Sequence, residues 1–269
     1  DGAQINPLNP ASYTAIDSLT FIFEGGVSLQ NMNISGSGVK LNAKNSSFDY
    51  LAMQFRLHPR IAMSIGLLPF SNVGYSVSDT QTATDPNTGA TADYARSYTG
   101  DGGLHQLYAG LGVKVLKNLS VGVNASYFWG DINRTRVVYF PSVSGAYNYN
   151  HQSVASVSSY KLDFGAQYTL DIDKKHSVTI GAVYSPELKL GNDYSVTTQM
   201  VSNSTGTAVS TTTLSPDATF KVPNTFGVGF TYNYDKRLTV GLDYSLQQWS
   251  KTKFDVNTPD EASCRNIVR

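Results

Sequence analysis

Apolar and polar residues alternate through residues 104–131, on both sides of a break at Lys117-Asn118. A period of two places successive side chains on opposite faces of a β-strand. The segment therefore predicts a β-hairpin with one apolar face and one polar or glycine face. The apolar face carries His105, Leu107, Ala109, Leu111, Val113 and Val115 before the turn, and Leu119, Val121, Val123, Ala125, Tyr127 and Trp129 after it.

The same alternation recurs along the chain and predicts about nine strands. They cover residues 18–30, 48–57, 61–78, 104–115, 119–140, 160–170, 178–184, 226–232 and 238–246. Each apolar set spans about 9–11 residues, which is the length that a tilted strand needs to cross the hydrocarbon of a bilayer.

The connections between these strands alternate in length. Long polar connections are expected at 31–47, 79–103, 141–155 and 191–221, and the last of these leaves open a continuation as strand above a membrane. Short turns separate the other neighbours, at 58–60, 117–118, 171–175 and 235–237. Short turns at one end and long loops at the other are typical of outer-membrane barrels, whereas the crossings of a soluble sandwich do not sort in this way.

Composition supports the membrane interpretation. Charged residues make up 15% of the chain, against roughly 25% in ordinary soluble domains. The mean hydropathy of -0.21 nevertheless differs from that of a protein with a large apolar core. An apolar exterior around a polar lumen explains both values. The net charge of zero offers no field for attracting nucleic acid, so no nucleic-acid partner is expected.

The faces opposite the apolar ones carry charged and amide side chains, including Arg56, Lys161 and Asp163. In the core of a soluble β-sandwich, each of these charges would need a fully satisfied partner, at several kcal/mol of desolvation risk. A water-filled lumen removes that cost. The sequence therefore favours an all-β, antiparallel, transmembrane up-and-down β-barrel whose partners include the lipid bilayer, with a soluble sandwich or glycan-binding domain as the alternative.

Nine is an odd number of strands, whereas bacterial single-chain barrels have even numbers. An open sheet edge in a bilayer also leaves backbone groups unpaired. The expectation from this pattern is a part of a longer barrel. We divide the chain into a segment before the first strand (1–17), the barrel strands (18–255) and an irregular end of an incomplete barrel (256–269).

Three motifs resemble those of the long-chain fatty-acid transporter family (FadL/TodX type). They are INPLNPASY at 5–13, SVTIGAVYSPELKLGNDYSV at 177–196, and KVPNTFGVGFTYNYDKRLTVGLDYSLQQWSKTKF at 221–254, in the same order as in that family. The wording around NPASY is similar to a Bacteroidota-like branch of it. The resemblance implies a barrel of about 14 strands when complete. It also implies that residues 1–17 are the C-terminal part of an N-terminal plug, with Asn9, Pro10 and Ala11 as its motif.

The resemblance also implies passive uptake of hydrophobic small molecules such as long-chain fatty acids, across the bacterial outer membrane and with lateral release through the wall. Pro69, Phe70 and Gly74 are the candidates for that lateral gate. Proline cannot donate to a strand ladder and glycine often marks a bend, so a break here would open the wall; an ordinary rim bulge is the alternative.

Several residues on the inward faces are candidates for contact with a ligand. Apolar side chains would line a dry pocket, and cations could pair with a carboxylate. The alternative is that these side chains pack against the plug and that the charges pair with nearby acids. The candidates are Ile22, Glu24, Arg56, Leu68, Tyr108, Lys114, Phe128, Lys161 and Val183.

The sequence predicts no enzyme, and no catalytic or metal site or cofactor. It contains no Gly-x-Ser-x-Gly motif or phosphate-binding glycine loop, and its single cysteine, Cys264, belongs to no cluster with zinc-ligand spacing. The leading hypothesis is a channel for a hydrophobic small-molecule ligand. The second is a barrel of the same shape that serves as a structural or accessory component of a surface protein-secretion or uptake complex, with protein partners at its extracellular loops.

Overall fold

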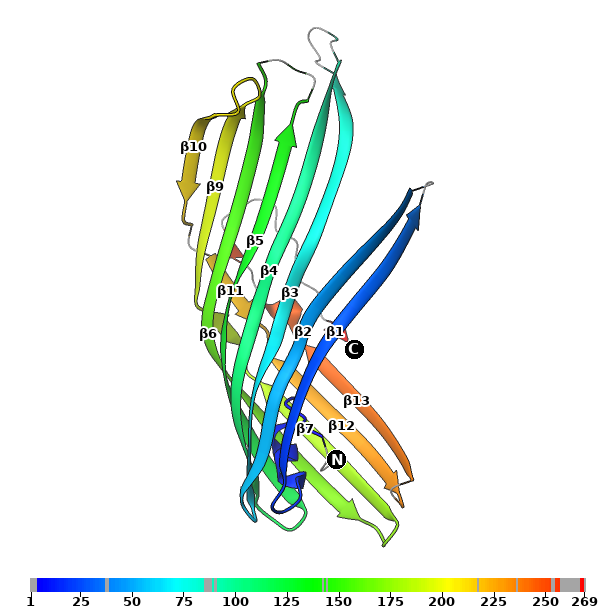
Figure 1. Ribbon diagram of the computed structural model, residues 1–269. Coiled ribbons are helices and arrows are strands. Elements are labelled where there is room, and N and C mark those ends of the chain that lie inside the picture. The colour runs from blue at the N-terminus through cyan, green and yellow to red at the C-terminus, as the bar shows by residue number, and fades with distance from the viewer. Residues whose placement is uncertain are drawn as a thin grey trace.

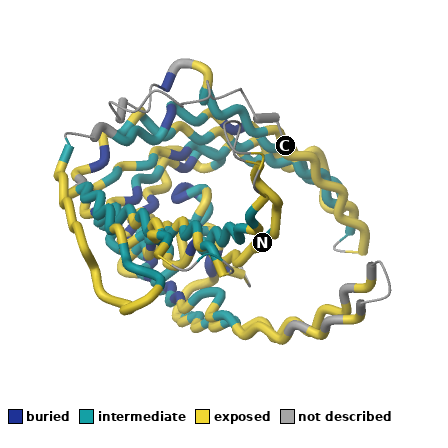
Figure 2. The backbone as a smooth tube through the Cα atoms, turned by 90° about the horizontal axis from the view of Figure 1, so that it is seen from above, coloured by how far each residue is buried: buried dark blue, intermediate teal, exposed yellow. Residues whose placement is uncertain are grey.

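The computed structural model describes residues 4–36, 39–84, 89, 91–141, 143, 145–216, 218–235, 237–252, 255–256 and 267–268. They form one large antiparallel sheet that curves around a central space, together with a small second sheet and two short 3-10 helices (Figure 1). Seen from above, the curved wall is open on one side (Figure 2). The prediction of an all-β antiparallel fold is confirmed.

Consecutive strands lie side by side through most of the wall, in the order β1-β2-β3-β4-β5-β6-β7-β12-β13. Their bounds are Phe21–Gly36 (β1), Val39–His58 (β2), Ile61–Thr84 (β3), Thr91–Lys114 (β4), Leu119–Tyr139 (β5), Tyr147–Asp171 (β6), His176–Ser185 (β7), Thr225–Tyr234 (β12) and Leu238–Gln247 (β13). These strands correspond to the nine predicted from the alternation.

The other strands lie between β7 and β12 or near the C-terminus. β9 (Asn192–Ser202) pairs with the upper part of β6, and β10 (Ala208–Leu214) pairs with β9. β8 (Leu188–Leu190), β11 (Ala218–Val222) and β14 (Asp255–Val256) form the small sheet, and β15 (Ile267–Val268) pairs with the end of β13. The expected irregular end at 256–269 lies mostly outside the described residues.

The two faces of the wall differ as the alternation predicts. On β4, Leu107, Leu111 and Val113 are exposed, whereas Tyr108 on the opposite face is buried. A hydrogen bond from the Val115 N–H to the Leu119 carbonyl oxygen, at 2.9 Å, closes the predicted turn of this hairpin. The apolar side chains therefore cover the outside of the curve, and the polar and glycine positions face the interior.

The expected long loops at 31–47 and 79–103 are wrong. The described residues there, apart from Gly89, continue the flanking strands: the register of β1 and β2 runs up to Gly36 opposite Val39, and that of β3 and β4 runs up to Thr84 opposite Thr91. Part of the connection expected at 141–155 is likewise strand, because β6 begins at Tyr147. The two strands of a hairpin in water satisfy each other's backbone hydrogen bonds, so neither face needs apolar residues. The apolar alternation used for prediction is therefore missing there.

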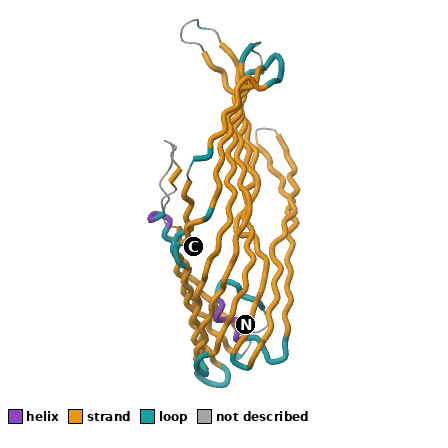
Figure 3. The backbone as a smooth tube through the Cα atoms, turned by 90° about the vertical axis from the view of Figure 1, so that its left-hand side faces the viewer, coloured by secondary structure: helices purple, strands orange, loops and turns teal. Residues whose placement is uncertain are grey.

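The N-terminal segment lies inside the curve of the wall. Its 3-10 helix η1 (Pro10–Ala15) contacts β3, β4, β5 and β6, near the end of the wall where the short turns lie (Figure 3). The second helix, η2 (Trp249–Lys251), follows β13. Neither helix of the described residues has the length and apolar character to span a bilayer.

Candidate functional site

The segment around Asn9 forms a capped turn because of its sequence. Asn9 is the N-cap of η1, where its side-chain oxygen accepts a hydrogen bond from the backbone N–H of Ala11 at 3.1 Å. Pro10 occupies the first helical position, where its missing N–H costs nothing. The Asn9 amide nitrogen also donates to the carbonyl oxygen of Ala166 on β6, at 3.4 Å, which joins the turn to the wall.

Glycines on the inner face make room for this turn. A Cβ atom added to Gly122 on β5 would collide with the backbone of Pro10, and one added to Gly165 on β6 would collide with the Asn9 side chain. At Gly112 on β4, an added Cβ would lie 2.7 Å from the Pro10 carbonyl oxygen. These adjacent strands therefore offer a smooth floor that the backbone of η1 approaches closely.

Tyr13 anchors the segment from within. Its side chain is fully buried, and its hydroxyl donates a hydrogen bond to Asn124 Oδ1 at 2.9 Å. Burial raises the pKa of the Tyr13 hydroxyl above its ordinary value, so the group stays neutral. The Asn124 amide nitrogen donates to the carbonyl oxygen of Pro7 at 2.7 Å, and Gln54 donates to that of Tyr13 at 3.0 Å.

Two of the predicted lumen-facing charges also hold the segment. Arg56 donates from Nη2 to the carbonyl oxygen of Thr14 at 3.1 Å, and also to that of Ile16. Glu24 accepts a hydrogen bond from the backbone N–H of Ile5 at 3.0 Å. The structure thus places both side chains inside the wall, where they contact the N-terminal segment; Arg56 also donates from Nη1 to the carbonyl oxygen of Pro59 at 3.1 Å. The assignment of 1–17 to an N-terminal plug stays a prediction.

An apolar patch lies beside this anchored segment on the interior face. Ile22 and Leu68 pack against a buried cluster that includes Tyr13 and Tyr108. Gln106 on β4 is paired with Leu68 on β3 at one edge and with Phe128 on β5 at the other. The rings of Phe70 and Phe128 meet edge to face, with centroids 4.6 Å apart. We call these five residues the lumen patch: Ile22, Leu68, Phe70, Tyr108 and Phe128.

The wall pairing breaks next to the lumen patch. β2 and β3 are paired from His58 opposite Ile61 up to Leu51 opposite Leu67, and above this level each of them pairs only with its other neighbour. In Figure 1 the β1–β2 hairpin diverges from β3 and β4 above this level. Pro69 lies two positions beyond the last pair, and the register of β3 against β4 shifts between Pro69 and Ser71.

Apolar residues lie on both sides of this break. Leu68 and Phe70 lie on its inner side, within the lumen patch. On the outer side, the apolar face continues past the last pair on β1 and β2 as Val27, Leu29 and Phe48, all of them exposed. The predicted gate residue Gly74 lies farther along β3, where an added Cβ would meet no atom within 4 Å.

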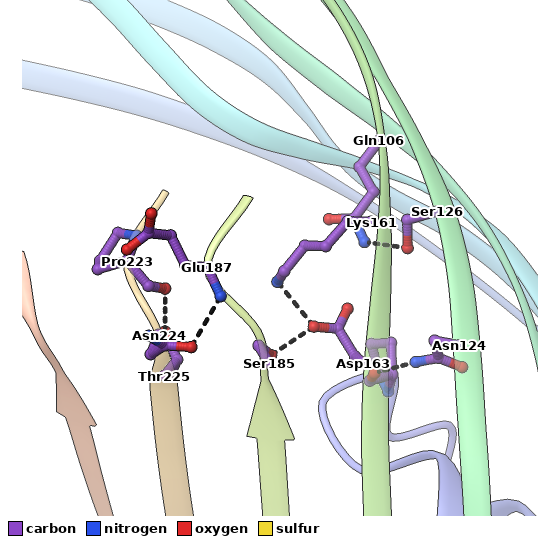
Figure 4. A network of polar contacts seen from close by, with 11 residues as sticks. Gln106, Asn124, Ser126, Lys161, Asp163, Ser185, Glu187, Pro223, Asn224 and Thr225 are labelled. Carbon is purple, nitrogen blue, oxygen red and sulfur yellow. Dashed lines mark hydrogen bonds and ion pairs between the residues drawn. The ribbon is translucent and has the colours of Figure 1, made fainter. Parts of the chain in front are cut away.

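The remaining predicted residues lie elsewhere on the interior. Lys161 forms an ion pair with Asp163, with Nζ and Oδ1 2.8 Å apart, and both come from β6 (Figure 4). Val183 on β7 covers Gly227 on β12, where an added Cβ would lie 2.6 Å from its methyl group. Lys114 is exposed at the end of β4. The ligand-binding roles of all these residues stay predictions.

Sequence reasoning missed the importance of Asn124 and of the interior glycines. Gly110, Gly112, Gly122 and Gly165 all fall on inward positions of the alternating pattern. Glycine in a strand interior often marks a close approach of another backbone, so this cluster was the available signal. Among the described residues, no group of three or more His, Cys, Asp or Glu side chains is placed to hold a metal ion.

The sequence of residues 1–267 matches the model of the family named BamG. The chain belongs to the BamG family. No protein of curated function matches it. The solved structures that resemble this chain share little sequence with it, so their similarity shows the fold alone.

Two solved structures with a similar fold are forms of the channel TodX. The toluene transporter TodX of P. putida has a TM-score of 0.56 and 13% identity, over 97% of this chain and 72% of that one. A TodX deltaS2S3 mutant, described as a monoaromatic hydrocarbon channel, has a TM-score of 0.54 and 14% identity over 90% of this chain. This chain spans 64% of the length of that mutant. The resemblance to FadL/TodX-type barrels is therefore confirmed for the fold, while fatty-acid specificity and a Bacteroidota-like source stay predictions.

Proposed function

We propose that this protein is an outer-membrane channel for the passive uptake of hydrophobic small molecules, which leave its lumen sideways between β2 and β3. The break in pairing above Leu51 and Leu67 carries the proposal. It connects an apolar interior patch with an apolar exterior, so a hydrophobic molecule would pass from lumen to lipid without entering water. The similarity to the TodX channels supports the same function.

Contacts inside the wall also bear on the ligand. Arg56, one of the predicted carboxylate-binding cations, already donates a hydrogen bond to the backbone of the N-terminal segment. In the lumen patch, in contrast, the Phe70 ring is exposed and Ile22 and Leu68 are partly exposed, beside the buried Tyr108 and Phe128. This arrangement suits a neutral hydrocarbon or the tail of a fatty acid, because each apolar carbon that leaves water contributes about 0.8 kcal/mol.

Joining the two sides of the break tests this route. Tyr50 and Leu68 would form the next pair above Leu51 and Leu67, so Tyr50→Cys and Leu68→Cys can be linked by oxidation or by a short bismaleimide. Cys264 is replaced by Ser in every variant. Entry of radiolabelled toluene, a neutral hydrocarbon, is measured in cells of a Gram-negative host that lacks its own hydrophobic channel. The outer leaflet of such a host resists toluene.

We expect the linked form to lose at least five-fold in uptake rate and to regain it when a disulfide is reduced. The matched control links Leu51→Cys with Leu67→Cys, a pair that already exists, and should leave uptake unchanged. Unchanged uptake in the Tyr50–Leu68 variant would disprove lateral exit at this break. If the unmodified protein gives no more uptake than an empty host, the channel proposal itself is wrong.

A second candidate function is that of an accessory component in a surface protein complex. The observation that favours it is the long extension of β3 and β4, which stay paired with each other beyond Pro69 as a two-stranded ribbon. The β3 part of this ribbon runs from Pro69 to Thr84, a length of roughly 50 Å at about 3.3 Å per residue. The Arg96–Asp79 ion pair and the hydrogen bond from Thr82 to Asp93 join its two strands. Replacing residues 78–97, which lie above the pair of Val77 with Tyr98, by a two-residue turn should abolish a protein-binding role while leaving the uptake of toluene intact.

A further inference from the structure

A second break in the wall lies on the edge of β6, away from the one between β2 and β3. The lower part of β6 pairs with β7 up to Phe164 opposite Tyr184, and its upper part pairs with β9 from Val157 opposite Asn192. A hydrogen bond from Ser158 N–H to the Gly191 carbonyl oxygen, at 2.9 Å, ends the upper ladder. Between them, residues 159–163 of β6 belong to no strand ladder on this edge within the described part of the chain, and the Ser159 hydroxyl donates a hydrogen bond to the carbonyl oxygen of Lys189 on β8 at 3.5 Å.

Two prolines at the same level end the neighbouring strands. Ser185, the last residue of β7, is paired with Thr225, the first residue of β12. Pro186 follows the former and Pro223 precedes the latter by two positions. Neither proline has an N–H to continue a ladder. Asn224 fixes the departing chain, because its Oδ1 accepts a hydrogen bond from the Glu187 N–H at 2.8 Å (Figure 4). The same oxygen accepts a second one from the Tyr184 hydroxyl at 3.2 Å.

The chain that leaves the wall at these prolines turns towards the interior. β8 and β11 pair with each other, with Leu190 opposite Phe220 and Leu188 opposite Val222. Leu190 packs in a buried cluster with Leu104 and Val157. Because Leu104 and Val157 occupy inward positions of β4 and β6, the segment between β7 and β9 packs inside the barrel rather than continuing the wall beside residues 159–163.

The break is polar on its inner side and apolar on its outer side. Inside, Lys161 and Asp163 form their ion pair with side chains only 14% and 15% exposed, and Ser185 Oγ donates a hydrogen bond to Asp163. Outside, Tyr160 is 76% exposed and Leu162 is 50% exposed. Unpaired backbone facing lipid costs several kcal/mol per group, so it is tolerated only where water, protein or another polar group reaches it.

We propose that this break is a second lateral portal, through which an amphiphile with an anionic head group crosses the wall. The head group takes the place of the Asp163 carboxylate beside Lys161. The Ser185 hydroxyl, which donates a hydrogen bond to Asp163, then donates one to the head group instead. The apolar tail meanwhile lies along Tyr160 and Leu162 on the lipid side. This proposal rests on the proposed channel function and divides its substrates: charged amphiphiles use β6 and β7, and neutral hydrocarbons use the break between β2 and β3.

A covalent link between β6 and β7 tests the portal. The side chains of Asp163 and Ser185 already touch, so the double change Asp163→Cys and Ser185→Cys allows a disulfide. With Cys264 replaced by Ser, uptake of radiolabelled oleate and toluene is compared in the oxidised and reduced forms of the same protein. The control links Ala166→Cys with Ala182→Cys, which are already opposite each other.

We expect oxidation of the Asp163–Ser185 variant to lower oleate uptake at least five-fold and to leave toluene uptake unchanged. Equal oleate uptake in both forms would overturn the portal without affecting the β2–β3 route. An equal loss for both substrates would also overturn it, because the link would then act on the whole barrel. If the unmodified protein takes up neither substrate, the channel function fails and the portal fails with it.

A second measurement follows the head group directly. An oleate analogue that carries a photoreactive group next to its carboxylate is cross-linked to the protein, and the labelled peptides are identified by mass spectrometry. Labels within residues 158–164 are expected for the unmodified protein and should fall at least five-fold in Lys161→Gln. Labelling there that is insensitive to Lys161→Gln would overturn the role of the cation.

Discussion

The hydroxyl of Tyr13 donates a hydrogen bond to Asn124 Oδ1 across 2.9 Å, and this bond joins the N-terminal segment to the inner face of β5. Tyr13 is fully buried and Asn124 almost fully so. Asn124 uses its other amide atom to hold Pro7, so a single side chain of the wall fixes the segment at two points. The N-terminal segment and the barrel are therefore expected to unfold as one unit.

Tyr13→Phe should destabilise the protein by about 1–3 kcal/mol, because it leaves a buried acceptor on Asn124 without a donor. Urea unfolding of the protein in lipid vesicles measures the difference. Tyr168→Phe is the matched control, since Tyr168 lies on the outer face and is exposed. An equal effect of the two substitutions would show that the Tyr13 hydrogen bond adds no stability.

Gly122→Ala should displace η1 from the wall. The added methyl group would collide with the backbone of Pro10, and overpacking of this kind costs about 1–3 kcal/mol. Gly241→Ala on β13 is the control, because its nearest contact there would be an ordinary 3.7 Å. Faster protease cleavage within residues 4–16 of the first variant alone is the expected result. Equal cleavage rates would contradict the close approach of η1 to Gly122.

The double change Pro69→Val and Gly74→Val should lower the uptake of toluene several-fold. Valine restores an N–H at position 69 and favours the extended backbone, so the pairing of β2 with β3 can continue past Leu67. Uptake in intact cells measures the effect, and the amount of folded barrel is checked by its gel mobility before and after heating. Unchanged uptake would identify the irregularity at Pro69 as an ordinary bulge.

Phe70→Ala should also lower toluene uptake, because it removes an aromatic surface from the lumen patch beside the β2–β3 break. Phe70→Leu keeps most of the apolar surface and should retain most of the uptake. Phe230→Ala provides a control on the outer face, where the same truncation leaves the lumen unchanged. If Phe230→Ala and Phe70→Ala give the same uptake, the lumen patch does not contact the substrate.

Protonation of Asp173 should loosen the turn between β6 and β7. The Asp173 carboxylate accepts hydrogen bonds from the backbone N–H groups of Lys175 and His176, at 2.7 and 2.9 Å. The bond from Lys175 contributes most to holding the pKa of Asp173 below its ordinary value. A lowered pKa means that the stabilisation is complete above about pH 4 and is lost as the pH falls through the folded-state value.

Hydrogen-exchange protection of the Lys175 and His176 amides measures this effect between pH 6 and pH 2. Protection should decrease at the acidic end in the unmodified protein. In Asp173→Asn it should be weaker but independent of pH, because the amide acceptor does not ionise. A pH-dependent loss that persists in Asp173→Asn would assign the effect to another group.

The outer and inner faces of the wall could be predicted from the sequence, while the extent of its strands could not. Leu111, Val113 and Leu162 fall on exposed positions that the alternation assigns to one face. The strands of the upper hairpins escaped prediction because polar residues occupy both of their faces. Thr82 and Asp93, for example, face each other in a ladder whose stability needs no apolar pattern.

The candidate site was predictable in its residue types and partly in its positions. Pro69 marked the neighbourhood of the β2–β3 break, and Asn9 and Pro10 marked a turn, because proline and asparagine act on their own backbone. The partner of Arg56, in contrast, is the backbone of Thr14, more than 40 residues earlier in the chain. Such contacts depend on the curvature of the whole sheet.

The sequence by itself determined which side of each wall strand is apolar, because side-chain direction in a strand alternates with every residue regardless of what surrounds it. Only the tertiary structure decided where neighbouring strands part, above Leu67 and beside residues 159–163. It also decided which interior glycines the backbone of Pro10 approaches closely. Those features depend on pairing between distant segments, where the hydrogen bonds of one edge can be satisfied by different partners, so no local pattern specifies them.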